Sequence, residues 1–327
     1  MSPKELQEIV YGFRTSRIVL TSMELKLYDA LEDGEQSSNE ISKKLSTNEK
    51  AIDRLMNALC ALELLQKKNG KFSNSEFSSR YLVKGKPDYI SNLFHSTDLW
   101  RSWSNLTEII YEGKPKGKFY EKRKEEHVDH FISAMHYRAS RQAKEDISKL
   151  NLKNVKNVLD LGGGSGAYAI EFVKVKKQIT AIVFDLPDVI PLTQKYISDA
   201  GLSDKIKTLK GNYLTDSIGA GYDLIFLSAI VHSNSFEENK KLIQKCADAL
   251  NKNGQVVIQD YVLDEERISP YSGTLFAINM LVNTQEGDAY TQKEISSWLT
   301  DAGLSDLSRN DTSHGASQII GREKIQS

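Results

Sequence analysis

The stretch Asn157–Phe172, NVLDLGGGSGAYAIEF, decides the fold of this chain. A short apolar run leads into three consecutive glycines, and a helical pattern follows them. Glycine at the end of a strand permits a tight turn, a positive φ and a close approach of backbone N–H groups to a ligand. Because four glycines fall within five residues between a strand and a helix, the stretch predicts a ligand-binding loop rather than a structural turn.

The chain around this loop alternates between strand-like and helical patterns. The strand-like runs are NVLDL (157–161), ITAIVFD (179–185), IKTLKG (206–211), YDLIFLSAIV (222–231) and GQVVIQDYVL (254–263). After a helical pattern at 290–304, two further runs follow around 306–308 and 317–320. This alternation predicts an α/β fold, with a parallel sheet and helices on both faces. In such a sheet, ligands bind at the carboxyl ends of the strands.

The first 150 residues read differently, as mostly helical sequence. Residues 4–33 carry apolar residues at three- and four-residue spacing, and two more helices precede KKNGKF (67–72), an Asn-Gly hairpin signal. Helix, helix and hairpin outline a winged helix. Its second helix mixes charges at Glu49, Lys50, Asp53 and Arg54, which makes a poor phosphate-binding face. We therefore expect a structural module at 1–100 and a catalytic domain at 101–327, and the alternative is a ligand-sensing winged-helix regulator.

Composition limits the class of protein further. The formal net charge of −1 argues against a strongly basic nucleic-acid-binding protein. The two cysteines, Cys60 and Cys246, have no partner motif, which favours a reducing compartment. The N-terminal residues carry charges throughout, and no run approaches the roughly 20 apolar residues of a membrane span. We expect a cytoplasmic protein that binds neither nucleic acid nor membrane.

Two cofactors compete for the glycine loop. Gly162, Gly164 and Ala167 fit a dinucleotide fingerprint, so one alternative is an NAD-linked oxidoreductase. Asp160, just before the glycines, would repel a pyrophosphate and attract a cationic ligand. Asp185 ends the second strand, where a carboxylate can accept two hydrogen bonds from a ribose diol. These features favour a cationic nucleoside cofactor.

Four segments carry a family resemblance: VLDLGGGSGAYAIEF (158–172), VFDLPDVI (183–190), GNYL (211–214), and YDLIFLSAIVHS with LIQKCADALNKNGQVVIQDYVL (222–233 and 242–263). They resemble the S-adenosylmethionine-dependent O-methyltransferases of the caffeic acid, acetylserotonin and hydroxyneurosporene type. The resemblance covers nearly the whole chain. It implies a class I methyltransferase with a Rossmann-like seven-stranded sheet that ends in an antiparallel hairpin. It also implies S-adenosyl-L-methionine as cofactor and a homodimer formed through N-terminal winged-helix-like helices.

The resemblance also implies the cofactor-binding residues. Asp160, Gly162 and Gly164 would line the methionine part of the cofactor. Asp185 would hold the ribose, and Leu186 would touch the adenine. Asn212 stands where the family usually has Asp and would meet the adenine edge, while Tyr213 would cover the ring.

The catalytic residues follow from the same comparison. The family's general base is a histidine after the fourth strand, in a pattern close to HDW, and IVHSNS puts His232 there. Asp260, 28 residues later, stands where the family has the carboxylate that orients the base. The position of the family's second carboxylate is held by Ala289, which leaves open whether Asp288 or Glu286 substitutes. The aromatic residue two positions after the histidine is replaced by Asn234.

Apolar residues in two helical segments predict an acceptor pocket, although such stripes are often core. The candidates are Phe131, Met135, Phe276, Asn279 and Met280. An apolar pocket with few polar groups suits the hydroxyl of a small aromatic or polyketide-like molecule. The alternatives are a sulfur, nitrogen or carbon acceptor, or a member that has lost methyl transfer. His127 and His130, with His136 nearby, could bind a metal, but the family needs none and we expect none.

Overall fold

The computed structural model describes residues 1–116 and 125–323, apart from the side chains of residues 125–127 and His130. The chain divides into two compact units, Met1–Trp100 and Arg101–Ser327. No helix of the described residues is both long and apolar enough to cross a membrane.

The first unit is mainly helical and carries one hairpin. Its elements are α1 (Pro3–Glu24), α2 (Leu27–Ala30), α3 (Ser38–Lys44), α4 (Glu49–Ala61), β1 (Leu65–Lys68), β2 (Lys71–Asn74), α5 (Glu76–Tyr81) and most of α6 (Leu93–Trp103). The hairpin predicted from KKNGKF is confirmed, because β1 and β2 pair antiparallel across Asn69 and Gly70, both at positive φ. The core of this unit gathers side chains from several helices and the hairpin, including Leu27, Met56 and Phe72.

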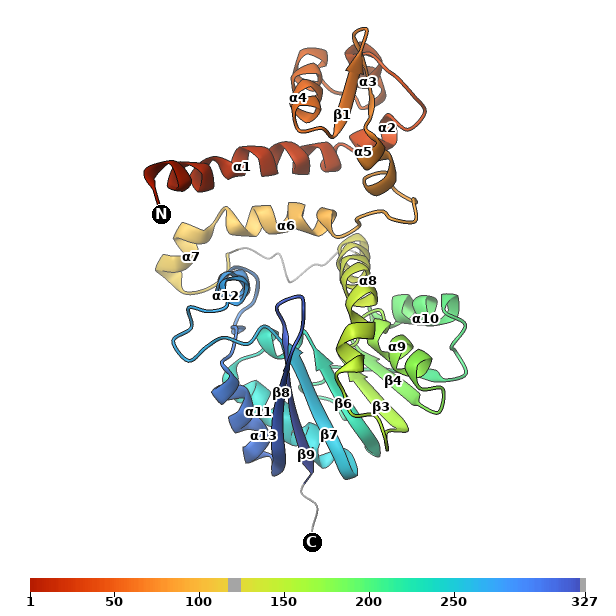
Figure 1. Ribbon diagram of the computed structural model, residues 1–327, viewed down its shortest axis with the longest axis vertical. Coiled ribbons are helices and arrows are strands. Elements are labelled where there is room, and N and C mark those ends of the chain that lie inside the picture. Colours follow the sequence, from red (N-terminus) through yellow and green to blue (C-terminus); the bar gives the residue numbers. More distant parts are fainter. Residues whose placement is uncertain (117–124, 324–327) are drawn as a thin grey trace. The chain divides into compact units, whose positions relative to one another are not determined.

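The second unit contains the predicted sheet. Its elements are α7 (Leu106–Glu112), α8 (Glu125–Ser148), β3 (Asn157–Leu161), α9 (Ala167–Val175), β4 (Thr180–Asp185), α10 (Ile190–Asp199), β5 (Ile206–Lys210), β6 (Tyr222–Ser228), α11 (Phe236–Asp248), β7 (Leu250–Asp260), α12 (Tyr271–Asn283), α13 (Gln292–Asp301), β8 (Leu304–Asp311) and β9 (Ser317–Glu323). The seven strands lie in the order β5-β4-β3-β6-β7-β9-β8 (Figure 1). The strands from β5 to β7 in this order are parallel, and β9 pairs antiparallel with β7 and β8. This arrangement confirms the expected fold class.

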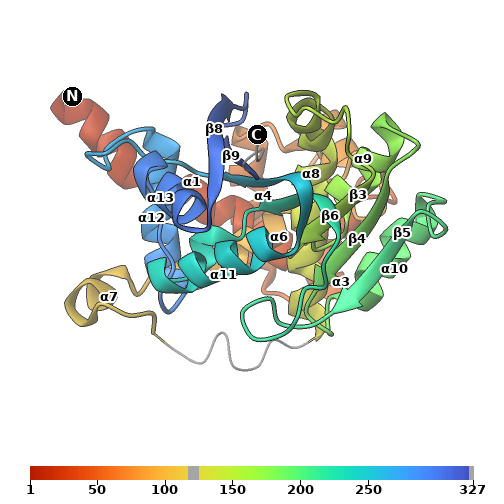
Figure 2. The same cartoon turned by 90° about the horizontal axis from the view of Figure 1, so that it is seen from below.

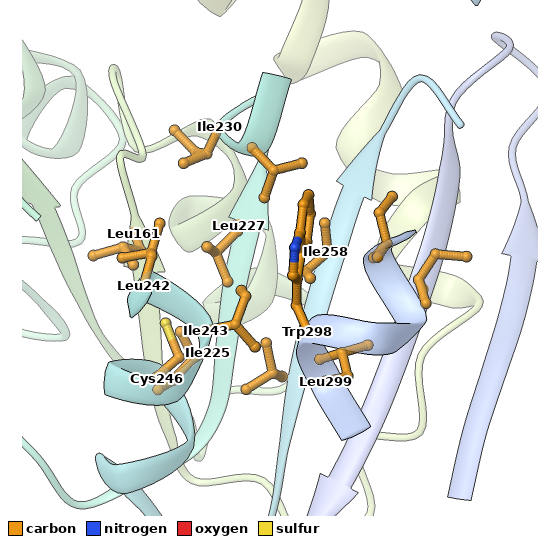
Figure 3. Close-up of a cluster of buried hydrophobic side chains, with 14 of the residues drawn as sticks. Leu161, Ile225, Leu227, Ile230, Leu242, Ile243, Cys246, Ile258, Trp298 and Leu299 are labelled. Atoms are coloured by element: carbon orange, nitrogen blue, oxygen red, sulfur yellow. The ribbon is translucent and has the colours of Figure 1, made fainter. Parts of the chain in front are cut away.

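Both faces of the sheet are covered, which explains why its central strands are apolar at nearly every position. Along β6, Leu224 and Phe226 join the core under α8, α9 and α10, while Ile225 and Leu227 join the core under α11 and α13. Figure 2 shows the two groups of helices on opposite sides of the strands. In the second core, Trp298 of α13 lies beside the strand residues and is fully buried (Figure 3).

The strand order places the reversal point of the sheet between β3 and β6. The chain moves from β3 outward to β4 and β5, then returns to β6 on the other side of β3. Ligands of open α/β sheets bind in the crevice at this point, beyond the carboxyl ends of the strands. The ends that meet there are Leu161 of β3, Asp185 of β4, Ser228 of β6 and Asp260 of β7.

Candidate active site

The glycine loop follows β3 directly, and two of its glycines are required by the protein's own atoms. A Cβ on Gly162 would collide with the side chain of Ile230, and this glycine has a φ of +67°. A Cβ on Gly163 would come within 2.6 Å of Asp160 Cγ and 2.8 Å of Val183. Around Gly164, in contrast, the nearest atom would be 3.8 Å away, on Ile132. Gly164 is therefore the position at which a ligand can approach the backbone.

Asp160 lies beneath the glycine loop. Its carboxylate is 1% exposed, lies under Gly163 and accepts the Ala169 N–H at 3.1 Å. Burial raises the pKa of Asp160 to about 7, with a smaller contribution from Asp185. The charge that should have attracted a cationic ligand is thus partly neutralised at neutral pH, because desolvation disfavours the ionised form. In this structure Asp160 supports the first turn of α9, and its contact with a cofactor stays a prediction.

Asp185 holds the loop at the tip of β4. Its Oδ2 accepts the Gly164 N–H at 2.7 Å, and its Oδ1 accepts the Leu186 N–H at 2.7 Å. A carboxylate oxygen has two lone pairs, so each oxygen can accept one more hydrogen bond. Burial raises the pKa of Asp185, while the two backbone hydrogen bonds oppose that rise. The adjoining side chain of Leu186 is 46% exposed and free to contact a ligand.

The loop after β5 carries the two residues expected at the adenine. Asn212 is exposed, and its Oδ1 accepts the Leu214 N–H at 2.9 Å. The Nδ2 group of Asn212 is therefore available as a donor, and its Oδ1 keeps a second lone pair. Tyr213 is half-buried beside the glycine loop, since its ring would lie 3.8 Å from a Cβ on Gly162. Its hydroxyl donates to Asn234 Oδ1 at 3.2 Å, and burial raises the pKa of Tyr213 to about 12.

His232 and Asp260 form a hydrogen-bonded pair between β6 and β7. His232 lies in a short 3₁₀ turn, Val231–Ser233, and its Nδ1 is 2.8 Å from Asp260 Oδ1 and 2.9 Å from Oδ2. Asp260 also accepts the backbone N–H of His232 at 3.3 Å and of Tyr261 at 2.8 Å. Because an ionised carboxylate only accepts, the pair assigns the proton to Nδ1 and leaves Nε2 as an acceptor. The shorter Asp side chain therefore reaches the histidine.

The surroundings of His232 are tightly packed. The ring of Phe276 meets the His232 ring edge-on, with centroids 4.8 Å apart, and Tyr261 lies 4.5 Å beyond it. A Cβ on Gly287 would collide with the carbonyl oxygen of His232. This close approach, which sequence reasoning missed, fixes the turn from the side of the segment 284–290.

The question of the second carboxylate has a structural answer for Asp288. Its Oδ2 accepts a hydrogen bond from Arg267 at 3.0 Å, and its Oδ1 accepts the Ala289 N–H at 2.8 Å. Arg267 also donates to Glu294 at 2.6 Å. Asp288 is therefore part of an ion-pair cluster with Arg267, Glu286 is exposed, and Ala289 is fully buried. Among the described side chains, Asp260 is the one carboxylate hydrogen-bonded to His232.

The predicted pocket residues lie on α8 and α12. Phe131, Met135, Phe276 and Asn279 are half-buried, whereas Met280 is 6% exposed and belongs mostly to the packed interior. Asn279 Oδ1 accepts two hydrogen bonds, from Trp103 Nε1 and from Asn283 Nδ2, both at 3.0 Å. Because an indole N–H only donates, it identifies this atom as the amide oxygen. Two surface hollows of about 330 and 220 Å³ lie elsewhere, and neither is lined by His232 or Asp260.

His136 of α8 contacts the glycine loop. Its Nδ1 is 2.9 Å from Ser165 Oγ, and its ring stacks on Tyr196 with centroids 3.9 Å apart. Burial lowers the pKa of His136, and Arg141 and Lys174 lower it further. The side chains of His127 and His130 lie outside the described residues. Within the described part, no group of three metal-ligating side chains is present.

Comparison with known proteins identifies the family. A family model described as the O-methyltransferase domain matches residues 103–305. The chain belongs to the O-methyltransferase family. A second model, the O-methyltransferase dimerisation domain, matches residues 7–84. The chain is therefore an S-adenosylmethionine-dependent methyltransferase with a dimerisation domain, and the NAD-linked alternative is wrong.

Individual relatives of this O-methyltransferase extend over almost its whole length. The 3-hydroxy-5-methyl-1-naphthoate 3-O-methyltransferase of Streptomyces sahachiroi is 28% identical, over 93% of this chain and 90% of the relative. The structure of an O-methyltransferase family protein from Burkholderia thailandensis is 25% identical, with a TM-score of 0.89 and 100% and 99% coverage. The fold also matches human N-acetylserotonin methyltransferase in complex with SAM at 23% identity and a TM-score of 0.85, with 98% and 97% coverage.

Several residues around the site of this O-methyltransferase have no signal in the sequence. Thr193 Oγ1 donates to Gly164 O at 2.5 Å, and His136 reaches Ser165 from another helix. Trp103 reaches Asn279 across 176 residues of chain. Thr193 and Trp103 lie in no motif, the sequence suggests His136 only as a possible metal ligand, and their hydrogen-bond partners reveal the roles of all three.

Proposed function

We propose that this O-methyltransferase methylates a hydroxyl of a small aromatic molecule, with His232 as the general base. The observation that carries the proposal is the partly buried hydrogen bond between His232 Nδ1 and Asp260, at the same edge of the sheet as the glycine loop. A phenol has a pKa near 10, so a base that removes its proton is useful at neutral pH.

The residues at the loop fit the cofactor. Gly164 leaves open space, Asp185 keeps one free lone pair on each oxygen for the ribose hydroxyls, and Leu186 and Asn212 are exposed beside it. When bound, S-adenosylmethionine supplies an electrophilic methyl group on a positively charged sulfur. Gly162 and Gly164 would border its methionine part, and Tyr213 would cover the adenine. Asp160 acts beneath the loop, by holding the start of α9.

His232 would act through its Nε2. Asp260 holds the proton on Nδ1, so Nε2 presents a lone pair to the acceptor hydroxyl. As the hydroxyl oxygen attacks, its proton passes to Nε2, and the buried Asp260 carboxylate stabilises the imidazolium that forms. Phe276, packed edge-on against the imidazole, limits the orientations of the ring.

Asn279 points to the chemistry of the acceptor. It follows Phe276 by three residues on α12, so both side chains lie on the same face of the helix. Trp103 and Asn283 occupy its oxygen, and its amide Nδ2 is left to donate. A donor at this place suits an acceptor that carries a carbonyl or carboxylate on the aromatic ring. The Streptomyces sahachiroi relative is named for such a molecule, a hydroxynaphthoate.

The proposal includes a homodimer formed through the first unit. The first half of α1 exposes four large apolar side chains by more than half, at Leu6, Ile9, Val10 and Phe13. A patch of this kind marks an interaction surface, and the matching dimerisation model covers residues 7–84. A cytoplasmic location is also proposed, because both cysteines are free thiols.

A thiol acceptor is the second candidate, favoured by Ala289 at the place of the second carboxylate. A thiol has a pKa near 8.5 and needs less help from a base. A panel assay with methyl-labelled S-adenosylmethionine separates the candidates. The panel contains hydroxynaphthoates, naphthols without a carboxylate, naphthalenethiol and naphthylamine.

We expect labelled methyl ethers from the hydroxynaphthoates and at least tenfold loss of that activity in His232→Ala. Methylation of naphthalenethiol alone, with His232→Ala fully active, would exclude the proposed base and acceptor.

A further inference from the structure

In the second unit, two buried asparagines, Asn234 and Asn239, link the Tyr213 loop, the His232 turn and helix α11 by hydrogen bonds. Asn234 lies two residues after His232 and directly follows the turn Val231–Ser233, and it is 3% exposed. Its Oδ1 accepts the hydroxyl of Tyr213 at 3.2 Å, and its Nδ2 donates to Asn239 Oδ1 at 3.0 Å. Asn239, fully buried on α11, donates in turn to the carbonyl oxygen of Val231 at 2.8 Å. A continuous path of hydrogen bonds therefore joins Tyr213 to the turn that carries His232.

Further hydrogen bonds anchor this path at Asn234 and at the Tyr213 loop. The backbone carbonyl of Asn234 accepts the hydroxyl of Tyr290 at 2.6 Å. On the other side, Lys245 of α11 donates to the carbonyl oxygens of Tyr213 at 2.7 Å, Leu214 at 3.1 Å and Asp216 at 2.9 Å. Helix α11 thus holds the Tyr213 loop through Lys245 and the His232 turn through Asn239. Such networks are retained when every member is satisfied, because each unpaired buried polar group is costly.

We propose that Asn234 is a positioning residue that fixes the Tyr213 ring and the His232 turn relative to each other. It touches neither the reacting hydroxyl nor the cofactor. It acts through its two neighbours, one at the proposed adenine site and the other next to the base. The inference rests on the proposed function. It adds that one amide, that of Asn234, fixes the position of the adenine site relative to the base.

The amide group is suited to this task by its chemistry. Its oxygen accepts the hydrogen bond from the Tyr213 hydroxyl, and its nitrogen donates to the Asn239 oxygen. A carboxylate at this position, which only accepts, could not donate to Asn239 Oδ1. Asn234→Ala leaves the Tyr213 hydroxyl and Asn239 Oδ1 unpaired, whereas Tyr213→Phe removes only the first hydrogen bond.

The test uses the full chain and S-adenosylhomocysteine as probe, so that no acceptor is needed. Calorimetric titration is expected to give about a fivefold weaker Kd for Tyr213→Phe, the effect of one lost hydrogen bond, and at least as large a loss for Asn234→Ala, which loses two. The double variant should bind no more weakly than Asn234→Ala, because both changes break the same bond. Tyr222→Phe is the matched control, since it removes a buried hydroxyl bonded to Ile218 O at 2.7 Å in the same core.

A second readout follows His232 directly. Histidines labelled with ¹⁵N are observed by NMR, and the His232 signal is assigned with His232→Gln. We expect Tyr213→Phe to shift the His232 ring signals without any ligand, although Asn234 separates the lost hydroxyl from the turn. A purely structural role would lower the unfolding temperature of the Asn234 and Tyr222 variants alike and leave the His232 signals in place.

Additive losses in Kd, or His232 signals unchanged in both variants, would overturn the inference. If the wild-type chain itself fails to bind S-adenosylhomocysteine, both the proposed function and this inference are refuted. If the wild type binds and the variants behave like it, the positioning role alone is refuted.

Discussion

The substitution Asp260→Asn tests the orienter of the proposed base most directly. The Asp260 carboxylate is 4% exposed and accepts hydrogen bonds from His232 Nδ1, His232 N and Tyr261 N. Asparagine keeps the shape but replaces one oxygen by an NH₂ group. Whichever way the amide turns, its donor faces an N–H of His232 or Tyr261. The imidazole therefore loses the charged carboxylate that holds its proton on Nδ1 and stabilises its charged form, and at best keeps a neutral amide oxygen as acceptor.

The size of the loss follows from the hydrogen bonds. A bond to a charged group contributes about 1.5–3 kcal/mol and a neutral one about 0.5–1.5 kcal/mol. The difference of about 1–1.5 kcal/mol corresponds to about a 5- to 10-fold change. A positioned base supplies about 10²–10⁴ in rate, so partial misorientation is expected to lower kcat by about 10- to 100-fold. KM for the acceptor should change little, because Asp260 reaches the acceptor only through His232.

The assay is steady-state methyl transfer to the best acceptor of the panel, at pH 7 and pH 9. For a phenol with a pKa near 10, the phenolate fraction rises about tenfold per pH unit, so the variant should recover at pH 9 relative to wild type. Asp223→Asn is the matched control, because Asp223 accepts the backbone N–H groups of Lys156 at 2.8 Å and Asn157 at 2.9 Å at the opposite edge of the sheet. A kcat for Asp260→Asn within twofold of wild type would refute the orienting role.

Four further predictions concern stability, packing, specificity and assembly. Asp160 has a pKa of about 7 in the folded chain and 3.8 in the unfolded chain, so ionisation of its carboxyl should lower the free energy of unfolding by up to about 4 kcal/mol as pH rises from 4 to 7. Denaturant titrations of Asp160→Asn should lack that decline. A pH profile of the variant that matches wild type would contradict the burial argument. Gly287→Ala should lower the free energy of unfolding by about 1–3 kcal/mol and reduce kcat, because the new Cβ displaces the carbonyl of His232. Thermal melts and kinetics that match wild type would show that the turn can shift without cost. Trp103→Phe should raise KM for hydroxynaphthoates several-fold with little change in kcat, because the Asn279 amide loses the hydrogen bond that fixes its orientation. A several-fold fall of kcat would show instead that Trp103 contributes to the methyl-transfer step. Phe13→Asp should convert a dimer to monomers in sedimentation velocity, whereas a retained dimer would move the interface away from this face of α1.

Local patterns in the sequence determined much of this protein. The alternation of strands and helices, the Asn-Gly hairpin and the glycine loop are read from neighbouring residues, because periodicity and turn chemistry act over a few positions. His232 could be assigned to the carboxyl edge of the sheet for the same reason, since it follows a strand-like run. The family resemblance added Asp260, which lies within hydrogen-bonding distance of His232 in the structure.

Tertiary structure decided what these residues face. Asp160 reads as a charge beside a ligand, but folding places it beneath Gly163, where burial raises its pKa to about 7. The orientation of the Asn279 amide depends on the hydrogen bond from Trp103, and Asn234 Oδ1 depends on Tyr213 of another loop for its hydrogen bond. Such contacts join residues that are distant in the chain, and their geometry is set by packing between elements rather than by local preference. The burial, partners and protonation of the site residues therefore became visible only once the sheet and its helices were assembled.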